Sequence, residues 1–293
     1  MAEIKKSKKN FPHIDIHPSL KDKLKAVQSI LQSEKYHELY IAEKDGNAIA
    51  LALSWLNTFH PSAKYIRFFA GEEQEENVYI YELLAPLLGS KSTQDKWIYS
   101  CCSNEKDNIA IVEEKGFHLF RRTFEETVGV TWMLQHLDSQ TIDEKITPLK
   151  EVMSDLKKKQ QFLSKIKTDY EQTHADNPVG CFTLTEWEEI LRNDCPDESR
   201  SSVLFIEEEI AAYIMLHPGD TENHYEIGWV GLDQTKQDIK LLKQLLFSQL
   251  QMLKDNGVQT VGIEADSTNP VARGLFDFLE LNKRKSWNSY ILK

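Results

Sequence analysis

The clearest hydrophobic pattern of the chain lies in its last third. An apolar, β-rich run over residues 225–232 is followed by a long segment, 235–256, whose leucines recur at helical spacing. Gly257 ends that segment, and a second β-rich run follows over residues 258–265. A short apolar helix then leads to a final strand over residues 286–292. This order of strand, helix, strand, helix and strand predicts an α/β fold.

The rest of the chain shows the same alternation, in a less regular form. In the first half the pattern predicts a helix, a hairpin around Asp45-Gly46, and then strands that alternate with helices up to residue 124. The second half begins with a long lysine-rich helix over 148–172 and a helix capped by Thr185, and continues with a hairpin over 203–216. Because the element order repeats after roughly 150 residues, the sequence predicts two homologous domains. We expect a basic flexible tail over 1–10, an N-terminal domain over 11–138 and a C-terminal domain over 139–293.

The amino-acid composition of the chain argues against some classes of binding partner. The net charge of -11 argues against nucleic acid as a partner, because proteins that neutralise phosphates are usually basic. An acidic surface suits an amine substrate, and it is equally an ordinary means of staying soluble. No apolar run approaches the length of a membrane-spanning helix, so we expect no membrane partner.

The cysteines and histidines give no sign of a metal centre. The four cysteines, at positions 101, 102, 181 and 195, form no CxxC pair, and the histidines lack ligand spacing. In a chain of this length they are typical of reduced thiols in a cytoplasmic protein, and we expect no metal.

Several short motifs resemble one enzyme family. Residues 226–232 (EIGWVGL) and 267–272 (STNPVA), with the elements around them, resemble the GNAT superfamily of N-acetyltransferases, and most of all a bacterial branch with tandem domains. In the first half, residues 114–117 (EKGF) and 121–127 (RRTFEET) resemble the end of a second, more degenerate GNAT unit. The resemblance implies two tandem GNAT-like domains, each a mixed, mostly antiparallel sheet flanked by helices.

The resemblance also implies a chemistry and a set of site residues. In this family an amine attacks the thioester of acetyl-CoA, the co-substrate, a carboxylate or water removes the proton, and a tyrosine often protonates the leaving thiolate. Glu226 lies on the strand where family members often carry the general base, and His224 is a weaker candidate for that role. The positions that correspond to cofactor contacts are Val230, Gly231, Leu232, Gln237, Lys240 and Asn269. Asn269 has a second interpretation, since Asn before Pro is a common helix cap.

The chain departs from the family pattern at the phosphate-binding loop. Aligned without gaps, that pattern falls on Gln237, Lys240 and Leu242, so both of its glycines are replaced. Glycine allows the backbone to approach a phosphate closely, although Lys240 could supply a point charge instead. In the first half the pattern falls on Glu75, among other acidic residues, so we expect a cofactor site only in the C-terminal domain.

A second departure concerns the general acid. The tyrosine position of the family's last helix is Phe276, which cannot donate a proton. Tyr290 and Tyr225 are the possible substitutes, with Tyr290 taken as the catalytic candidate.

Two functions follow from these features. The first is an acetyl-CoA-dependent N-acetyltransferase that acts on a small-molecule or peptide amine, with its site in the C-terminal domain. The second is a catalytically inactive binding or scaffold protein that has lost the phosphate loop and the acid. Because a tandem chain can supply its own partner domain, we expect a monomer.

Overall fold

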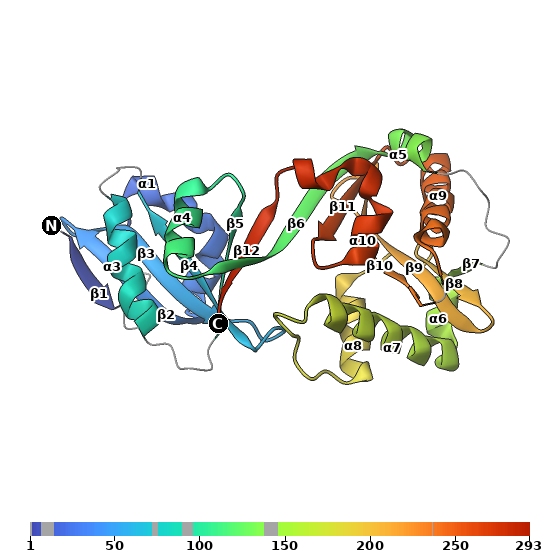
Figure 1. Ribbon diagram of the computed structural model, residues 1–293, viewed down its shortest axis with the longest axis horizontal. Coiled ribbons are helices and arrows are strands. Elements are labelled where there is room, and N and C mark those ends of the chain that lie inside the picture. The colour runs from blue at the N-terminus through green and yellow to red at the C-terminus, as the bar shows by residue number, and fades with distance from the viewer. Residues whose placement is uncertain (1, 7–14, 72–75, 90–95, 138–145, 236) are drawn as a thin grey trace. The chain divides into compact units, whose positions relative to one another are not determined.

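The chain folds into two compact units whose segments are interleaved in the sequence. The computed structural model describes residues 2–6, 15–71, 76–89, 96–137, 146–235 and 237–293 (Figure 1). The first unit comprises Met1–Phe120, Asp176–Gly180 and Asn288–Lys293, and the second comprises Arg121–Ala175 and Cys181–Trp287. The boundary predicted between residues 138 and 139 lies outside the described residues.

The first unit is one sheet with helices packed against it. Its strands follow the order β1-β2-β3-β4-β5-β12, with antiparallel pairing from β1 to β4 and a parallel pair β4–β5. The strands are β1 (Glu3–Lys6), β2 (Tyr36–Lys44), β3 (Asn47–Leu56), β4 (Ala63–Ala70), β5 (Lys96–Cys102) and β12 (Trp287–Leu292). The helices are α1 (Pro18–Lys21), the 3₁₀ helix η2 (Lys23–Val27), α2 (Gln28–Gln32), α3 (Glu76–Gly89) and α4 (Lys106–Glu114).

The second unit has the same pattern of strand directions. Its order is β7-β8-β9-β10-β11-β6, and every pair is antiparallel except the parallel pair β10–β11. The strands are β6 (His118–Gly129), β7 (Ile146–Pro148), β8 (Ser202–Ile206), β9 (Glu209–Pro218), β10 (His224–Leu232) and β11 (Thr260–Asp266). The helices are α5 (Val130–His136), α6 (Leu149–Ser154), α7 (Leu156–Thr173), α8 (Leu184–Asp194), α9 (Ile239–Asp255) and α10 (Pro270–Leu275), followed by the 3₁₀ helices η3 (Asp277–Leu279) and η4 (Leu281–Lys283). The predicted mixed α/β fold with mostly antiparallel sheets flanked by helices is confirmed.

The two units exchange their last strands. Residues 121–129 of β6 follow the first half of the sequence but belong to the second unit, where they pair with β11. Residues 288–292 of β12 end the chain but belong to the first unit, next to β5 in the strand order. Each unit is therefore completed by a strand from the other half of the sequence.

The structure differs from the predicted elements at three places. Residues 3–6, expected in a flexible tail, form β1, where Lys5 contacts Glu43 at 3.1 Å; residues 7–10 lie outside the described residues. The predicted long helix is divided at Asp155, whose side chain caps α7 by accepting from the Lys158 N–H at 3.0 Å. Thr183, and not Thr185, caps α8, because it forms a capping box with Glu186.

The core of the second unit holds β10 and β11 in place. The leucines predicted as the core face of α9 are buried against the sheet; they are Leu242, Leu245, Leu246, Leu250 and Leu253. A separate cluster packs α6, α7 and α8 against β8 and β9, with Phe162, Leu163 and Ile166 from α7. Within the described part of the chain, no helix combines the length and apolar character needed to cross a membrane.

Candidate functional site

Strands β10 and β11 separate along their length. Their register partners run only from His224 opposite Thr260 to Ile227 opposite Ile263, although both strands continue beyond that point. On its other edge β10 carries a bulge between Ile227 and Val230 in its pairing with β9. A bulge adds a residue to one strand and bends it. The strands therefore open into a gap after Ile227, with the β11-facing edge of residues 228–232 left without a strand partner.

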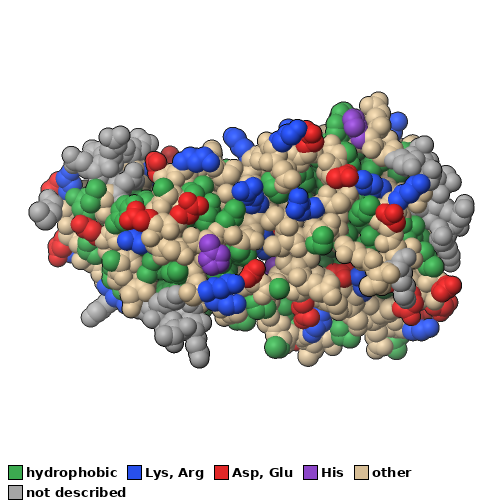
Figure 2. All heavy atoms as spheres, in the orientation of Figure 1, with side chains coloured by type: hydrophobic (Ala, Val, Ile, Leu, Met, Phe, Trp, Pro, Cys, Tyr) green, Lys and Arg blue, Asp and Glu red, His purple; other side chains and the backbone are tan. Residues whose placement is uncertain are grey.

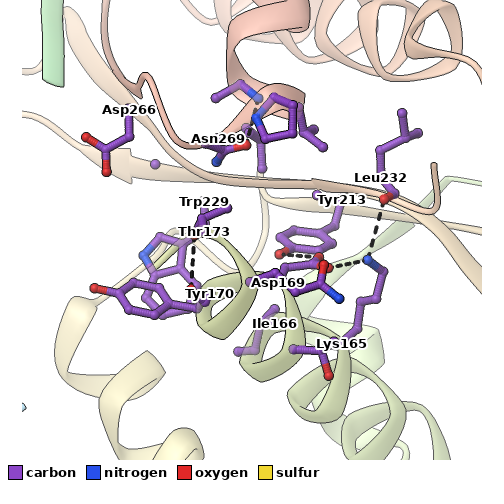
Figure 3. A pocket seen from close by; sticks show the side chains of 18 of the residues that line it. Lys165, Ile166, Asp169, Tyr170, Thr173, Tyr213, Trp229, Leu232, Asp266 and Asn269 are labelled. Carbon is purple, nitrogen blue, oxygen red and sulfur yellow. Dashed lines mark hydrogen bonds and ion pairs between the residues drawn. The ribbon is translucent and has the colours of Figure 1, made fainter. Parts of the chain in front are cut away.

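A cavity of about 1030 Å³ lies at this gap, entirely within the second unit. It is lined by α7, by the last residue of α8, by Tyr213 and His217 of β9, by β10 and the loop after it, by β11, and by the residues at the start of α10. Figure 3 shows this lining, with Tyr170 and Asp169 on α7, Trp229 on β10 and Asn269 at the opposite wall. Cavities of this volume suit a ligand the size of a cofactor.

The lining of the cavity is acidic. Among its described residues, Lys165 is the one lysine or arginine. The carboxylates are Asp169, Asp194, Glu226, Asp233, Glu264 and Asp266. On the face of the molecule drawn in Figure 2, acidic and basic side chains are interspersed, so the net charge does not mark a site there. The cavity lining is selectively acidic, which favours a cationic ligand.

Two of these carboxylates lie on the same face of the sheet where the strands part. Glu226 is the register partner of Gly262, and Glu264 is two residues further along β11 and is the first residue beyond the last pair. A Cβ at Gly262 would lie 1.8 Å from Glu226 Oε2, so the carboxylate of Glu226 occupies the space above this glycine. Glu226 Oε1 is 2.7 Å from His224 Nε2, which fixes the direction of the carboxylate.

Glu264 has the electrostatic environment of a proton acceptor. Its side chain reaches the solvent in the cavity, yet protein surrounds it closely, and this burial raises the pKa of its carboxyl group. Asp266 and Glu125, both negatively charged, raise the pKa of Glu264 further. A raised pKa moves a carboxyl group towards neutral pH, where a general base works best.

An aromatic wall faces the acidic strands. The rings of Tyr170 and Trp229 have centroids 5.5 Å apart, and His174 stacks on Tyr170 at 3.9 Å. Trp187, which is fully buried, supports Trp229 from behind at 6.1 Å. Aromatic faces beside carboxylates attract ammonium groups through cation–π interaction.

A partly buried hydrogen-bond network forms one part of the cavity lining. Tyr213 donates a hydrogen bond to Asp169 at 3.0 Å, and Lys165 donates to the same carboxylate at 2.5 Å (Figure 3). Burial raises the pKa of Asp169, and the hydrogen bonds from Lys165 and Tyr213 oppose that effect. A Cβ at Gly231 would lie 2.1 Å from the ring of Tyr213, so glycine is needed for this close packing.

Two N–H groups of the loop after β10 donate hydrogen bonds within the loop. The Thr235 N–H donates to Asp233 Oδ1 at 3.1 Å, and the Gln237 N–H donates to the Asp233 carbonyl at 2.9 Å. At the start of α9, Asp238 Oδ1 accepts from the Lys240 N–H at 3.1 Å. The helix end thus carries its own negatively charged cap.

At the opposite wall, α10 begins with a capped turn. Asn269 Oδ1 accepts from the Ala272 N–H at 3.0 Å, which confirms the cap predicted from the Asn-Pro pair. The Asn269 side chain also lines the cavity, as does Thr268, whose buried Oγ1 has no hydrogen-bond partner among the described residues.

The structure brings together some of the predicted site residues and not others. Those that line the cavity are Glu226, Val230, Gly231, Leu232 and Asn269. Gln237 and Lys240 follow the loop but are not part of the lining. Tyr290 is 3% exposed in the core of the first unit, because β12 belongs to that unit. The structure therefore does not bring Tyr290 to the cavity.

The other candidates are also placed away from the lining. Tyr225 points to the opposite face from Glu226 and donates to Asp197 at 2.9 Å. Phe276 is buried in the core, as its apolar ring requires. Glu75 lies outside the described residues. Among the residues that the structure describes, no group of three or more His, Cys, Asp or Glu side chains is arranged to hold a metal ion.

Sequence reasoning missed four residues of this site. Glu264 was part of a predicted strand, and Asp169 and Tyr170 were part of a predicted helix, without further role. Trp229 belonged to a recognised motif but was not assigned a contact. Side chains alternate between the two faces of a strand, so the sequence of β11 predicts that Glu264 and Asp266 lie on the same face. This was the one signal in the sequence that could have identified Glu264.

Comparisons with known proteins give a family model for part of the chain and a fold for nearly all of it. Residues 161–279 match the family model described as the acetyltransferase (GNAT) family. Among solved structures, the chain is similar to a GCN5-related N-acetyltransferase from Sphaerobacter thermophilus, with a TM-score of 0.59 and 11% identity over 90% of this chain and 84% of that one. No curated protein matches the sequence.

Two further structures cover nearly the whole chain. A tandem GNAT protein from the clavulanic acid biosynthesis pathway has a TM-score of 0.55 at 8% identity, over 100% of this chain and 98% of that one. An acetyltransferase of the GNAT family from Colwellia psychrerythraea has a TM-score of 0.52 at 11% identity, over 99% and 100%. At these identities the likeness shows the fold, including its tandem form.

Proposed function

Since residues 161–279 belong to the GNAT acetyltransferase family, we propose that the second unit is an N-acetyltransferase acting in the cavity between β10 and β11. The proposed reaction transfers an acetyl group from acetyl-CoA to a primary amine, carried by a small molecule or a peptide: the amide C–N bond forms, the thioester C–S bond breaks, and coenzyme A leaves as a thiolate that takes a proton from solvent. The observation that carries the proposal is the position of Glu264, with its raised pKa, where the two strands separate.

The open edge of β10 suits the arm of the donor. Pantetheine contains two amide groups, and an extended chain with amides can pair with an exposed strand edge. Residues 228–232 offer such an edge along the cavity wall. The acetyl thioester, when bound, supplies an activated acyl group. Residues 228–232 would hold the donor in the same cavity that Glu264 lines.

The acidic and aromatic lining suits the amine acceptor. An amine reaches the cavity as an ammonium ion, which the carboxylates attract and which Trp229 and Tyr170 can contact with their ring faces. The acceptor is therefore oriented with its nitrogen towards the carboxylates of β10 and β11. Holding two reactants in one geometry supplies much of the rate enhancement in such a transfer.

Glu264 is the proposed proton acceptor. The ammonium group must lose a proton before it can attack, and the raised pKa of Glu264 favours uptake of that proton. Glu226, the base expected from the sequence, lies beside it and contributes to the raised pKa. Its hydrogen bond to His224 and its half-exposed side chain offer a route for the proton to solvent.

The test is an acetylation assay with a panel of amines. Full-length protein is incubated with acetyl-CoA and neutral, mono-, di- and polyamines, and both released thiol and acetylated amine are measured. We expect transfer to cationic amines, a loss of about 10²- to 10⁴-fold in Glu264→Gln, and no change in the matched surface variant Glu198→Gln. Turnover unaffected by Glu264→Gln would contradict the assigned role.

The alternative is a binding protein without catalysis. It is favoured by the buried Phe276, which stands where the family often carries its acid. Under this alternative an amine or thioester binds and raises the melting temperature, yet no acetylated amine forms with any member of the panel.

A further inference from the structure

The diphosphate of coenzyme A makes specific demands on a protein. A phosphate group at a helix N-terminus is held by unpaired backbone N–H groups and by the positive end of the helix dipole. The equivalent place here is the loop between β10 and α9, of which the structure describes residues 233–235, 237 and 238, together with the first turn of α9.

Three N–H groups of the loop and of the first turn of α9 are already hydrogen-bonded within the chain. Those of Thr235 and Gln237 donate to Asp233, to the side chain and the carbonyl respectively. The Lys240 N–H donates to the Asp238 carboxylate at 3.1 Å. A diphosphate would have to displace these acceptors before it could bind.

A negative charge at the start of α9 also opposes a diphosphate. The carboxylate of Asp238 caps the first turn of this helix, and like charges at close range repel. Among the described lining of the cavity, the one lysine or arginine is Lys165, whose Nζ lies 2.5 Å from Asp169 Oδ1. Leu242, at a position that the family reserves for glycine, is fully buried in the core.

The part of the site that suits the pantetheine arm is open. Residues 228–232 line the cavity, and β11 has no register partner for them. One half of the family's donor site is therefore open, and the other half is closed by hydrogen bonds and negative charge.

We propose that this site binds its donor through the pantetheine arm and makes no favourable contact with the diphosphate. The donor class is then a thioester of pantetheine, with or without the nucleotide. This inference rests on the proposed transferase function, because it concerns the donor of the same reaction.

The experiment compares ligands that contain each part of the donor. Dissociation constants are measured by isothermal titration of the full-length protein with acetyl-CoA, acetyl-pantetheine and ADP. We expect the dissociation constants of acetyl-CoA and acetyl-pantetheine to agree within about tenfold, and their ratio to change little with salt concentration. We expect no binding of ADP. A preference of more than tenfold for acetyl-CoA, or binding of ADP, would overturn the inference while leaving the transferase intact.

The variant Asp238→Ser tests whether the charge of Asp238 opposes binding of the diphosphate. Serine caps a helix as well as aspartate does, so the fold is retained, and melting temperature verifies this. Removal of the charge is expected to lower the dissociation constant of acetyl-CoA at least threefold and to leave that of acetyl-pantetheine unchanged. An equal change for both ligands would contradict the role of Asp238. If neither thioester binds to the wild-type protein, the proposed function and this inference both fail.

Discussion

The carboxylate of Glu226 lies over Gly262, where a Cβ would stand 1.8 Å from its Oε2. The two residues are register partners on parallel strands, at the last part of the sheet before β10 and β11 separate. The missing side chain of Gly262 therefore makes room for a charged group at the mouth of the cavity.

Replacing Gly262 by alanine is expected to reorient Glu226. Because the Glu226 side chain is half exposed, it can swing away, so the melting temperature should change little. Its hydrogen bond to His224 would be lost, and we expect the catalytic rate to fall by roughly tenfold. The measurement is kcat for single and double variants. In a Glu226→Gln background, Gly262→Ala should have little further effect, and full additivity would argue against this coupling.

Glu264→Gln should stabilise the protein at neutral pH. Burial raises the pKa of Glu264, so the folded state holds this proton more tightly than the unfolded chain. Stability therefore falls as pH rises from the ordinary glutamate pKa of about 4.3 through the raised value. Thermal melts should show the variant above wild type at about pH 7.5 and equal to it near about pH 4. A variant that is less stable at both values would contradict the raised pKa.

Substitutions at Asn269 should separate its two roles. Asn269→Ala removes the cap of α10 and is expected to cost about 1 kcal/mol of unfolding free energy. Asn269→Ser restores the cap, so urea melts should return to wild type. Donor binding should stay weaker by about fivefold in the serine variant if the amide contacts the thioester arm. Wild-type affinity in Asn269→Ser would show that the residue is only a cap.

Trp229→Ala is expected to weaken the acceptor site. Loss of the ring removes a cation–π partner that lies 5.5 Å from Tyr170, so the KM for the amine should rise by about 3- to 30-fold. Trp229→Phe keeps an aromatic face and serves as the matched control. A KM for the amine that is unchanged in Trp229→Ala would place the acceptor elsewhere in the cavity.

The sequence was most informative where pattern and local chemistry agree. The strand around Glu226, the leucine face of α9 and the cap at Asn269 each depend on residues close in sequence, and the structure has all three. The same holds for Val230, Gly231 and Leu232, which lie on the strand that lines the cavity.

Features that depend on distant residues could not be predicted in this way. Alternation along a strand specifies which face is buried but not which strand is its neighbour, so the exchange of β6 and β12 gave no local signal. Tyr290 is a clear example, because its place in the first unit follows from that exchange. The raised pKa of Glu264 likewise depends first on burial by the surrounding fold, and in part on Glu125, which is far away in sequence.

The closed phosphate loop combines both kinds of feature. The replaced glycines were visible in the sequence, and they indicated a weakened site. The internal hydrogen bonds from Thr235, Gln237 and Lys240 depend on loop geometry, which the sequence did not provide. The replaced glycines and the internal hydrogen bonds together lead us to expect that the donor is bound without its diphosphate.

The most direct test of the account is amide hydrogen exchange with and without acetyl-pantetheine, followed by mass spectrometry. We expect slower exchange for residues 228–232 of β10, whose open edge would pair with the donor arm, and no change in β3 of the first unit. Unchanged exchange in residues 228–232 at a saturating concentration of the thioester would contradict it.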